Sequence, residues 1–170
     1  MTQNLLRRDL MVSSDTTILL VEDDPGHAAL IRHALECVRP SVRIMHVADG
    51  ETAIDYLFEK GSYAVPGTAP RPGVVLLDLR LPRIDGIEVL RAVKTCEALW
   101  SIPVVVLTTS SADLDVATAY ANHANSYLVK PFGFDEFRHM LEDLDRYWCT
   151  WNTPAPAARA MAAVYTVPAS

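Results

Sequence analysis

The stretch of sequence that decides the fold is VVLLDLRLPRIDGIEVL, residues 74–90. Its first part, residues 74–79, is an apolar run rich in β-branched side chains and interrupted by Asp78. Such a run is typical of a strand that is buried on both faces in a parallel sheet. Pro82 separates this strand from apolar residues at helical spacing, which predict a helix at about residues 86–99. The stretch therefore predicts a strand that leads through a short loop into a helix.

The same alternation of strand and helix patterns extends along most of the chain. Short apolar runs predict strands at residues 17–21, 42–47, 74–79, 104–107 and 126–130. Helical spacing predicts helices at residues 25–38, 49–58, 86–99 and 111–123, and a last helix that follows Pro131 and ends at Trp148. Because right-handed crossovers place helices on both faces of such a sheet, we predict an α/β fold with a doubly wound, five-stranded parallel sheet.

Composition limits the domain organisation and the classes of partner. The chain has 170 residues, of which 50% are hydrophobic, and a formal net charge of −6. This length suits one domain, predicted at residues 16–151, between an N-terminal segment (1–15) that is flexible or docks and an Ala/Pro-rich tail (152–170). An acidic balance without a Lys/Arg cluster argues against nucleic-acid binding. No apolar run is long enough to cross a membrane.

The cysteines and the tail point to a compartment and a mode of output. The sequence holds three widely spaced cysteines, an odd number that suits free thiols in a reducing compartment, so we expect a cytoplasmic protein. The tail is too short for a helix-turn-helix or a catalytic module. The output is therefore expected to be contact with other proteins, or phosphotransfer.

Charged and hydroxyl side chains stand at the ends of four of the predicted strands. Glu22, Asp23 and Asp24 follow the first strand, and Asp78 closes the apolar run of the third. The last two such strands end in Thr108 and Lys130, respectively. In open parallel sheets, ligands bind beyond the carboxyl ends of the strands. Oxygen ligands favour Mg²⁺, with Mn²⁺ as an alternative, and a cation beside a fixed lysine can neutralise a phosphoryl group. The pattern predicts a magnesium-dependent phosphoryl site.

Each of these residues also has a purely structural interpretation. Asp23 or Asp24 alone is more often a helix N-cap before a proline, and Asp78 alone could simply lie against the core. Thr108 alone is more often a strand residue, and Lys130 alone is more often a solvated strand end. Solvated charges have no reason to gather at the ends of several different strands, and this shared position favours the site.

Four segments at these residues resemble the receiver domain of two-component response regulators. They are ILLVEDD (18–24), VLLDLRLPRIDGIEVL (75–90), IPVVVLTTS (102–110) and YLVKPF (127–132). The resemblance covers residues 16–147 and implies a flavodoxin-like strand order, 2-1-3-4-5. It also implies a function, in which the chain accepts a phosphoryl group from a partner sensor histidine kinase in a Mg²⁺-dependent reaction.

The resemblance assigns roles to single residues. Asp78 would be the phosphoacceptor. The metal would be held by Glu22, Asp23, Asp78 and the backbone carbonyl of Arg80. Thr108 and Lys130 would contact the phosphoryl oxygens, Tyr127 would be an aromatic switch, and Pro131 would follow a cis peptide bond. The predicted long loop at residues 61–72, the bulky end of the last helix and the short tail are also similar to regulators paired with bacterial phytochrome kinases.

The last predicted helix carries a stripe of large apolar residues. The stripe consists of Phe134, Phe137, Leu141, Leu144, Trp148 and Trp151. It can simply pack on the sheet. Because the helix is longer than a strand, its aromatic end could instead overhang the sheet and form a homodimer or kinase contact. The homodimer hypothesis uses Phe137, Leu141, Leu144, Trp148 and Trp151, together with the face made by the fourth helix, the fifth strand and the fifth helix.

Other functions fit the sequence less well. A degenerate receiver that acts as a constitutive interaction module should lack Asp78, Lys130 or an acidic partner, and none is missing. A phosphatase of the haloacid-dehalogenase type needs a second acid two residues after the nucleophile, where this chain has Arg80. A flavin or dinucleotide site needs a Gly-rich or Ser/Thr-rich first loop. The five histidines show no spacing typical of zinc ligands.

Overall fold

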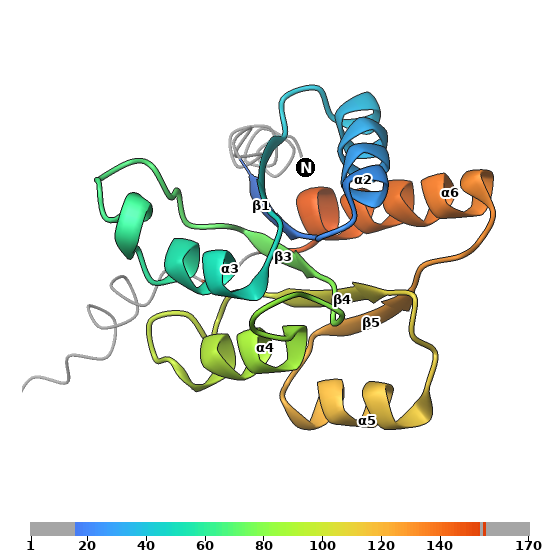
Figure 1. Ribbon diagram of the computed structural model, residues 1–170. Helices are drawn as coiled ribbons and strands as arrows, with labels where there is room; N and C mark the ends of the chain where they lie inside the picture. The colour runs from blue at the N-terminus through green and yellow to red at the C-terminus, as the bar shows by residue number, and fades with distance from the viewer. Residues whose placement is uncertain (1–15, 154, 156–170) are drawn as a thin grey trace, which may run out of the picture.

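The structure is a computed structural model that describes residues 16–153 and residue 155, and Figure 1 shows the arrangement of its elements. The strands are β1 (Thr17–Val21), β2 (Arg43–Val47), β3 (Val74–Leu77), β4 (Val104–Thr108) and β5 (Ser126–Val129). The α-helices are α2 (Pro25–Val38), α3 (Gly50–Leu57), α4 (Gly86–Thr95), α5 (Asp113–Ala121) and α6 (Phe134–Asp145). A 3₁₀ turn, η1 (Gly61–Tyr63), follows α3, and a π-helical turn, η2 (Arg146–Trp151), follows α6. The predicted N-terminal segment and most of the predicted tail lie outside the described residues.

The five strands form one parallel sheet in the order β2-β1-β3-β4-β5, as predicted. The strand order reverses at β1, because the chain adds β2 on one side of β1 and then crosses to add β3 on the other. Val21, the last residue of β1, pairs with Leu77, the last residue of β3. The residues that follow these two strands therefore leave the sheet side by side, at the point where ligands bind in folds of this kind.

Two apolar layers hold the helices on the two faces of the sheet. Alternate strand residues point to opposite faces, so Leu19 and Val75 join one cluster while Ile18 and Leu76 join the other. The first cluster contains the buried faces of α3, α4 and α5, and the second contains those of α2 and α6. The same division is visible in Figure 1, where α2 and α6 lie on one side of the sheet and α3, α4 and α5 on the other.

Two aspartates start the helices that follow β1 and β2. Asp24 is the N-cap of α2, because its Oδ1 accepts a hydrogen bond of 2.8 Å from the backbone N–H of His27. That hydrogen bond is the main reason that the pKa of Asp24 lies below its ordinary value. Asp49 caps α3 in the same way through the N–H of Thr52. Asp24 is thus the cap before Pro25, and Asp23 is left for another role.

Some predicted element boundaries are wrong. Helix α4 ends at Thr95 rather than at residue 99, because Cys96 has an extended backbone and a turn follows it, closed by a hydrogen bond from Leu99 N to Cys96 O. The last α-helix ends at Asp145, and the backbone continues as the π-helical turn η2 instead of one helix through Trp148. Strands β3 and β5 end before Asp78 and Lys130, which begin the loops.

Candidate functional site

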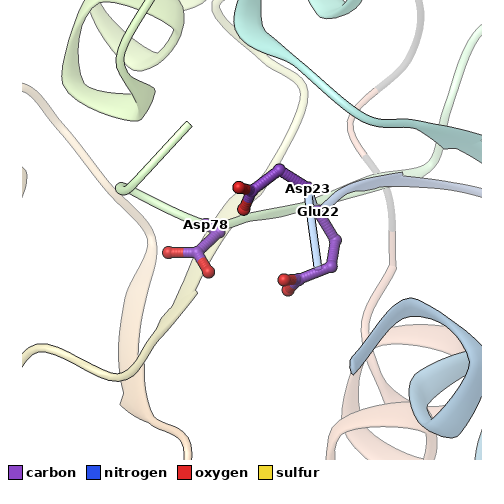
Figure 2. Close-up of side chains that lie close together, drawn as sticks. All are labelled: Glu22, Asp23 and Asp78. Atoms are coloured by element: carbon purple, nitrogen blue, oxygen red, sulfur yellow. The ribbon is translucent and has the colours of Figure 1, made fainter. Parts of the chain in front are cut away.

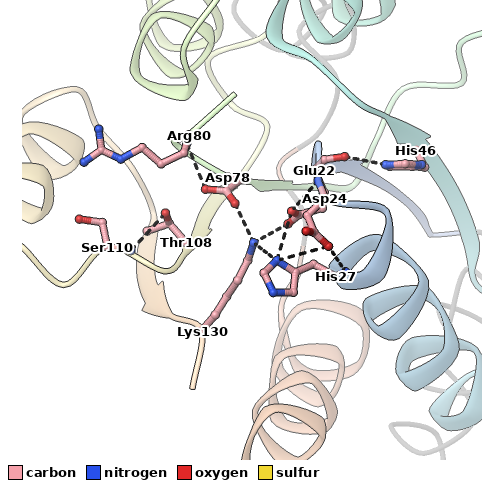
Figure 3. Close-up of polar contacts among 9 residues, drawn as sticks. All are labelled: Glu22, Asp24, His27, His46, Asp78, Arg80, Thr108, Ser110 and Lys130. Carbon is pink, nitrogen blue, oxygen red and sulfur yellow. Dashed lines mark hydrogen bonds and ion pairs between the residues drawn. The ribbon is translucent and has the colours of Figure 1, made fainter. Parts of the chain in front are cut away.

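The polar residues predicted at the strand ends meet at one edge of the sheet. Glu22 and Asp23 directly follow β1, Asp78 directly follows β3, Thr108 is the last residue of β4, and Lys130 directly follows β5. Figure 3 shows Lys130 reaching across this edge toward Asp78 and Glu22. The parallel register brings these side chains together, although up to 108 positions separate them in the sequence.

Three carboxylates make the acidic part of the site. Oxygen atoms of Glu22, Asp23 and Asp78 all lie within 4.8 Å of one another, and Figure 2 shows the three side chains converging on one space. Glu22 and Asp78 are buried, whereas Asp23 is exposed. Three carboxylates at this separation repel one another, and a hard divalent cation with oxygen ligands relieves that repulsion. The donor set therefore fits Mg²⁺ or Mn²⁺, with one side open to solvent.

The ammonium group of Lys130 lies between two of these carboxylates. Its Nζ is 2.7 Å from Asp78 Oδ2 and 2.5 Å from Glu22 Oε2, and only 2% of the Lys130 side chain is exposed. A buried lysine needs such partners, because an unpaired charge in the interior is strongly unfavourable. Lys130 is therefore held in place by the two carboxylates, and its contact with phosphoryl oxygens stays a prediction.

The two buried carboxylates differ in their pKa values. Burial is the largest influence on both and by itself would raise each pKa. At Asp78 the hydrogen bond and the charge of Lys130, with the N–H of Arg80, outweigh burial and hold the pKa below its ordinary value. At Glu22 burial prevails, and its pKa is raised. Asp78 is thus kept as an ionised carboxylate, the form that can attack phosphorus.

The loop after Asp78 folds tightly against the site. The N–H of Arg80 donates a hydrogen bond of 3.1 Å to Asp78 Oδ1, and the N–H of Gly86 donates one of 3.0 Å to the carbonyl of Leu79. A Cβ on Gly86 would lie 2.2 Å from the carbonyl oxygen of Asp78, so only glycine fits there. The backbone carbonyl of Arg80 as a metal ligand remains a prediction.

On the other side of Asp78, Thr108 and Tyr127 are linked through one loop. Thr108 is fully buried, and its Oγ1 lies 3.5 Å from the backbone N of Ser110, which donates to it. The hydroxyl of Tyr127 donates a 2.9 Å hydrogen bond to the carbonyl of Ser110. Burial raises the pKa of Tyr127, so its hydroxyl stays protonated and remains a donor. The predicted hydroxyl and the predicted aromatic switch therefore both contact Ser110.

Two residues at the site were not predicted from the sequence. His27, in the first turn of α2, places its Nδ1 3.5 Å from both Glu22 Oε1 and Lys130 Nζ (Figure 3). Asp115, in the first turn of α5, accepts hydrogen bonds from the side chains of Arg80 and Ser110. Both residues lie in the first turn of a helix that follows a strand ending at the site: β1 before α2, and β4 before α5. That position is the one sequence signal that could have indicated them.

Two expectations for the C-terminal part of the domain are corrected. Phe137, Leu141 and Leu144 are buried in the core beside α2 and the sheet, so in this structure they cannot form a dimer surface. Trp148 is half-buried against the same core, whereas 62% of Trp151 is exposed. The expectation of a cis peptide before Pro131 is also wrong. Among the described residues every peptide bond is trans, the isomer ordinarily favoured before proline.

Comparison with known proteins identifies the family. Residues 18–142 match the family model of the response regulator receiver domain. The chain is 46% identical over 160 residues to the probable methanogenesis regulatory protein FilR2 of Methanothrix harundinacea, across 92% of this chain and 100% of that protein. It is 38% identical over 141 residues to the response regulator Rcp1 of Synechocystis, across 83% of this chain and 93% of Rcp1. The chain belongs to the receiver domain family of response regulators.

Solved structures agree with this membership. The fold superposes on the phosphorylated cyanobacterial phytochrome response regulator RcpA with a TM-score of 0.79 and 35% identity, covering 84% of this chain and 99% of that one. The Mn²⁺-bound form of Rcp1 gives a TM-score of 0.78 at 35% identity, covering 83% and 99%. The chain is thus a response regulator that is phosphorylated on an aspartate, a signalling phosphoacceptor rather than a conventional enzyme.

One observation concerns membranes. Among the helices of the described residues, none combines the length and the apolar character needed to cross a bilayer.

Proposed function

We propose that Asp78 is the aspartate that accepts the phosphoryl group, from a phosphohistidine on a partner kinase. The proposal is supported above all by the contact of Lys130 Nζ with Asp78 Oδ2. This contact helps to hold the pKa of the Asp78 carboxyl below its ordinary value. Among the described carboxylates that follow strands, Asp78 combines a central position at the reversal of strand order with an open acidic side. Glu22, Asp23, Asp78 and the backbone carbonyl of Arg80 would hold Mg²⁺ or Mn²⁺.

The chemistry assigned to these residues is a direct displacement at phosphorus. A bond forms between an Asp78 carboxylate oxygen and the phosphorus atom while the bond between phosphorus and the histidine nitrogen breaks, and the imidazole regains a proton. When bound, the divalent cation supplies neutralisation of the charge on the phosphoryl oxygens. Lys130 adds a positive charge beside Asp78, and Thr108 offers a hydroxyl at the end of β4.

The signal would arise from the loop after β4, where Ser110 contacts both Thr108 on β4 and Tyr127 on β5. A phosphoryl group adds a charge of about −1.5 to −2 and three strong hydrogen-bond acceptors to Asp78. Movement of Thr108 toward those oxygens would disturb its contact with Ser110 N, and therefore the hydrogen bond from Tyr127 to Ser110 O. The face of α5, β5 and α6 is the bistable surface of this proposal, with output through protein contacts.

Intact-protein mass spectrometry tests the role of Asp78. The wild type, incubated with acetyl phosphate and Mg²⁺, should gain the mass of one phosphoryl group, and chelation of Mg²⁺ should prevent the gain. Asp78→Asn should gain none, while Asp55→Asn, a change of the same type on α3, should behave as the wild type. A phosphoryl gain that persists in Asp78→Asn would contradict the assignment. Absence of any gain in the wild type would favour a constitutive interaction module instead.

The partner in this proposal is a sensor histidine kinase, and a bacterial phytochrome is the specific candidate. RcpA, at 35% identity and a TM-score of 0.79, is described as a phytochrome response regulator. A cytoplasmic setting is part of the proposal, since Cys37, Cys96 and Cys149 are free thiols. Phosphotransfer from a purified phytochrome kinase that is faster than from an unrelated kinase would support the pairing, and equal rates would argue against it.

A homodimer is the second part of the partner proposal, in a corrected form. Exposed apolar side chains in this part of the domain include Val129 on β5 (41% exposed), Phe134 on α6 (59%) and Trp151 on η2 (62%). Together with the half-buried Trp148 they replace the buried members of the predicted stripe. Light scattering should give twice the chain mass, and Phe134→Ser with Trp151→Ser should reduce it to one chain. A monomer mass, unchanged by beryllofluoride, would overturn the dimer.

A further inference from the structure

One carboxylate in the first turn of α5 connects the two loops on either side of the site. Asp115 Oδ2 accepts a hydrogen bond from Arg80 Nη2 at 2.7 Å and another from Ser110 Oγ at 2.5 Å. Arg80 belongs to the loop after β3, and Ser110 belongs to the loop after β4. A single oxygen atom therefore connects the two loops.

Both partners of Asp115 are themselves bonded to site residues. Arg80 donates its backbone N–H to Asp78 Oδ1, and Ser110 donates its backbone N–H to Thr108 Oγ1. The carbonyl of Ser110 also accepts the hydrogen bond from Tyr127. Asp115 is thus linked to Asp78 through Arg80, and to Thr108 and Tyr127 through Ser110. The contacts described include none between Asp115 and these three residues.

The side chain of Arg80 is held away from Asp78. Figure 3 shows it extended from the site toward Ser110, and its guanidinium ends in the ion pair with Asp115. The Arg80 side chain is 68% exposed and that of Asp115 is 24% exposed, so this pair is accessible and can exchange. A phosphoryl group on Asp78, two residues from Arg80, would offer a stronger anionic partner to the same guanidinium.

We propose that Asp115 is a positioning residue that shortens the lifetime of the acyl phosphate by competing with the phosphoryl group for Arg80. In hydrolysis, a water oxygen bonds to phosphorus while the bond from phosphorus to the Asp78 oxygen breaks, which yields the carboxylate and inorganic phosphate. A guanidinium bound to the phosphoryl oxygens would stabilise the phosphorylated state and obstruct the approach of water. Asp115 withdraws that guanidinium. This inference rests on the proposed role of Asp78.

The test measures the lifetime of the phosphoryl group on the full chain. Protein loaded with acetyl phosphate and Mg²⁺ is freed of acetyl phosphate, and the decay is followed by intact mass. Asp115→Asn should lengthen the half-life by about two- to five-fold, the range expected for a partly exposed ion pair. Asp115→Asn should also raise the affinity for beryllofluoride. Asp113→Asn, a change of the same type on an exposed residue of the same helical turn, should leave both unchanged.

A double-mutant cycle shows whether the effect passes through Arg80. In an Arg80→Ala background, Asp115→Asn should produce no further change in the half-life. In the wild-type background, Asp115→Glu keeps the carboxylate and should therefore have a half-life near that of the wild type. An unchanged or shorter half-life in Asp115→Asn would overturn the inference, as would the same lengthening in the Arg80→Ala background. Failure of the wild type to gain a phosphoryl group would instead overturn the proposed function, and this inference with it.

Discussion

The ammonium group of Lys130 forms ion pairs with two buried carboxylates at once. Its Nζ contacts Glu22 Oε2 and Asp78 Oδ2, and its side chain is almost fully buried. Removing the ammonium would leave two carboxylates in the interior without their cation, which is far more costly than losing an exposed ion pair. A divalent cation bound by the same carboxylates could replace part of the lost positive charge.

Lys130→Met is therefore expected to lower the free energy of unfolding by about 3 kcal/mol in the absence of Mg²⁺. Millimolar Mg²⁺ should restore part of the loss, because the cation binds the folded state and reduces the repulsion between Glu22 and Asp78. Urea unfolding with and without Mg²⁺ measures both effects. Lys60→Met, at an exposed position where Nζ lies 5.2 Å from the Phe58 ring centroid, should cost no more than about 1 kcal/mol. Equal stability of the two variants without Mg²⁺ would contradict this account of the site.

Differences in burial predict that the cysteines differ in reactivity. Burial, together with the nearby Asp145 carboxylate, raises the pKa of Cys149 to about 12, whereas Cys37 is exposed on α2. Since the thiolate is the nucleophile, Cys149 should be alkylated by iodoacetamide much more slowly than Cys37. Peptide mass spectrometry over a time course measures the two rates. In urea the difference should disappear. Equal rates in the folded protein would show that Cys149 is not protected.

The sequence predicted the position of a residue correctly where the backbone alone fixes that position. Asp78 and Lys130 directly follow apolar strands, so a parallel sheet must bring them to one edge. His27 and Asp115 lie on helices, and the side chains that they meet depend on how each helix is rotated and docked on the sheet. Strand patterns contain no information on that packing, and the sequence therefore did not indicate these two residues.

Helix α4 begins against the backbone of the site, and this contact can be tested. A Cβ on Gly86 would lie 2.2 Å from the carbonyl oxygen of Asp78 and 2.6 Å from Leu79 Cα. Both are backbone atoms, so the clash cannot be relieved by rotation of a side chain. Gly86→Ala should destabilise the fold by about 2 kcal/mol and reduce the rate of phosphoryl gain, because the loop after Asp78 must shift.

Thermal unfolding and phosphorylation by acetyl phosphate measure these two effects of Gly86→Ala. The control is Gly133→Ala at the N-cap of α6, where the nearest atoms belong to the Glu136 side chain at 3.4 Å or more. It should cost less than about 1 kcal/mol and leave phosphorylation unchanged. If the two variants behave alike, the close approach of Gly86 does not constrain the site.

Elements were predicted better than their ends. Continuous apolar runs indicated β1, β3 and β4, which are buried throughout because helices cover both faces of the sheet. The end of the last helix was missed because it depends on contacts that are distant in the sequence. Arg39, at the end of α2, donates hydrogen bonds to Asp145 and to Thr150, and Asn152 N bonds to Tyr147 O across the π-helical turn. Helical spacing alone cannot distinguish that turn from a further turn of α-helix.

At the scale of the whole described domain, an ion pair joins the C-terminal end of α2 to the end of α6. Arg39 Nε donates to Asp145 Oδ1 at 3.0 Å and its Nη2 donates to Asp145 Oδ2 at 3.2 Å, across 106 positions of sequence. Asp145 is 2% exposed, so the pair is largely desolvated on the acidic side. It lies at the C-terminal end of α2, whereas the phosphoryl site lies beyond the N-terminal end of the same helix.

Breaking this pair should affect stability without affecting phosphorylation. Arg39→Met leaves the Asp145 carboxylate buried without a cation, and the free energy of unfolding should fall by about 3 kcal/mol. Arg39→Met combined with Asp145→Leu should recover a large part of the loss, because no buried charge remains. Arg32→Met is the control, since its contact with Glu36 is 3.8 Å long and half-exposed. Urea unfolding ranks the variants, and phosphoryl gain from acetyl phosphate should match the wild type in all of them. A double variant less stable than Arg39→Met would show that shape complementarity, rather than the buried charge, dominates at this end of the domain.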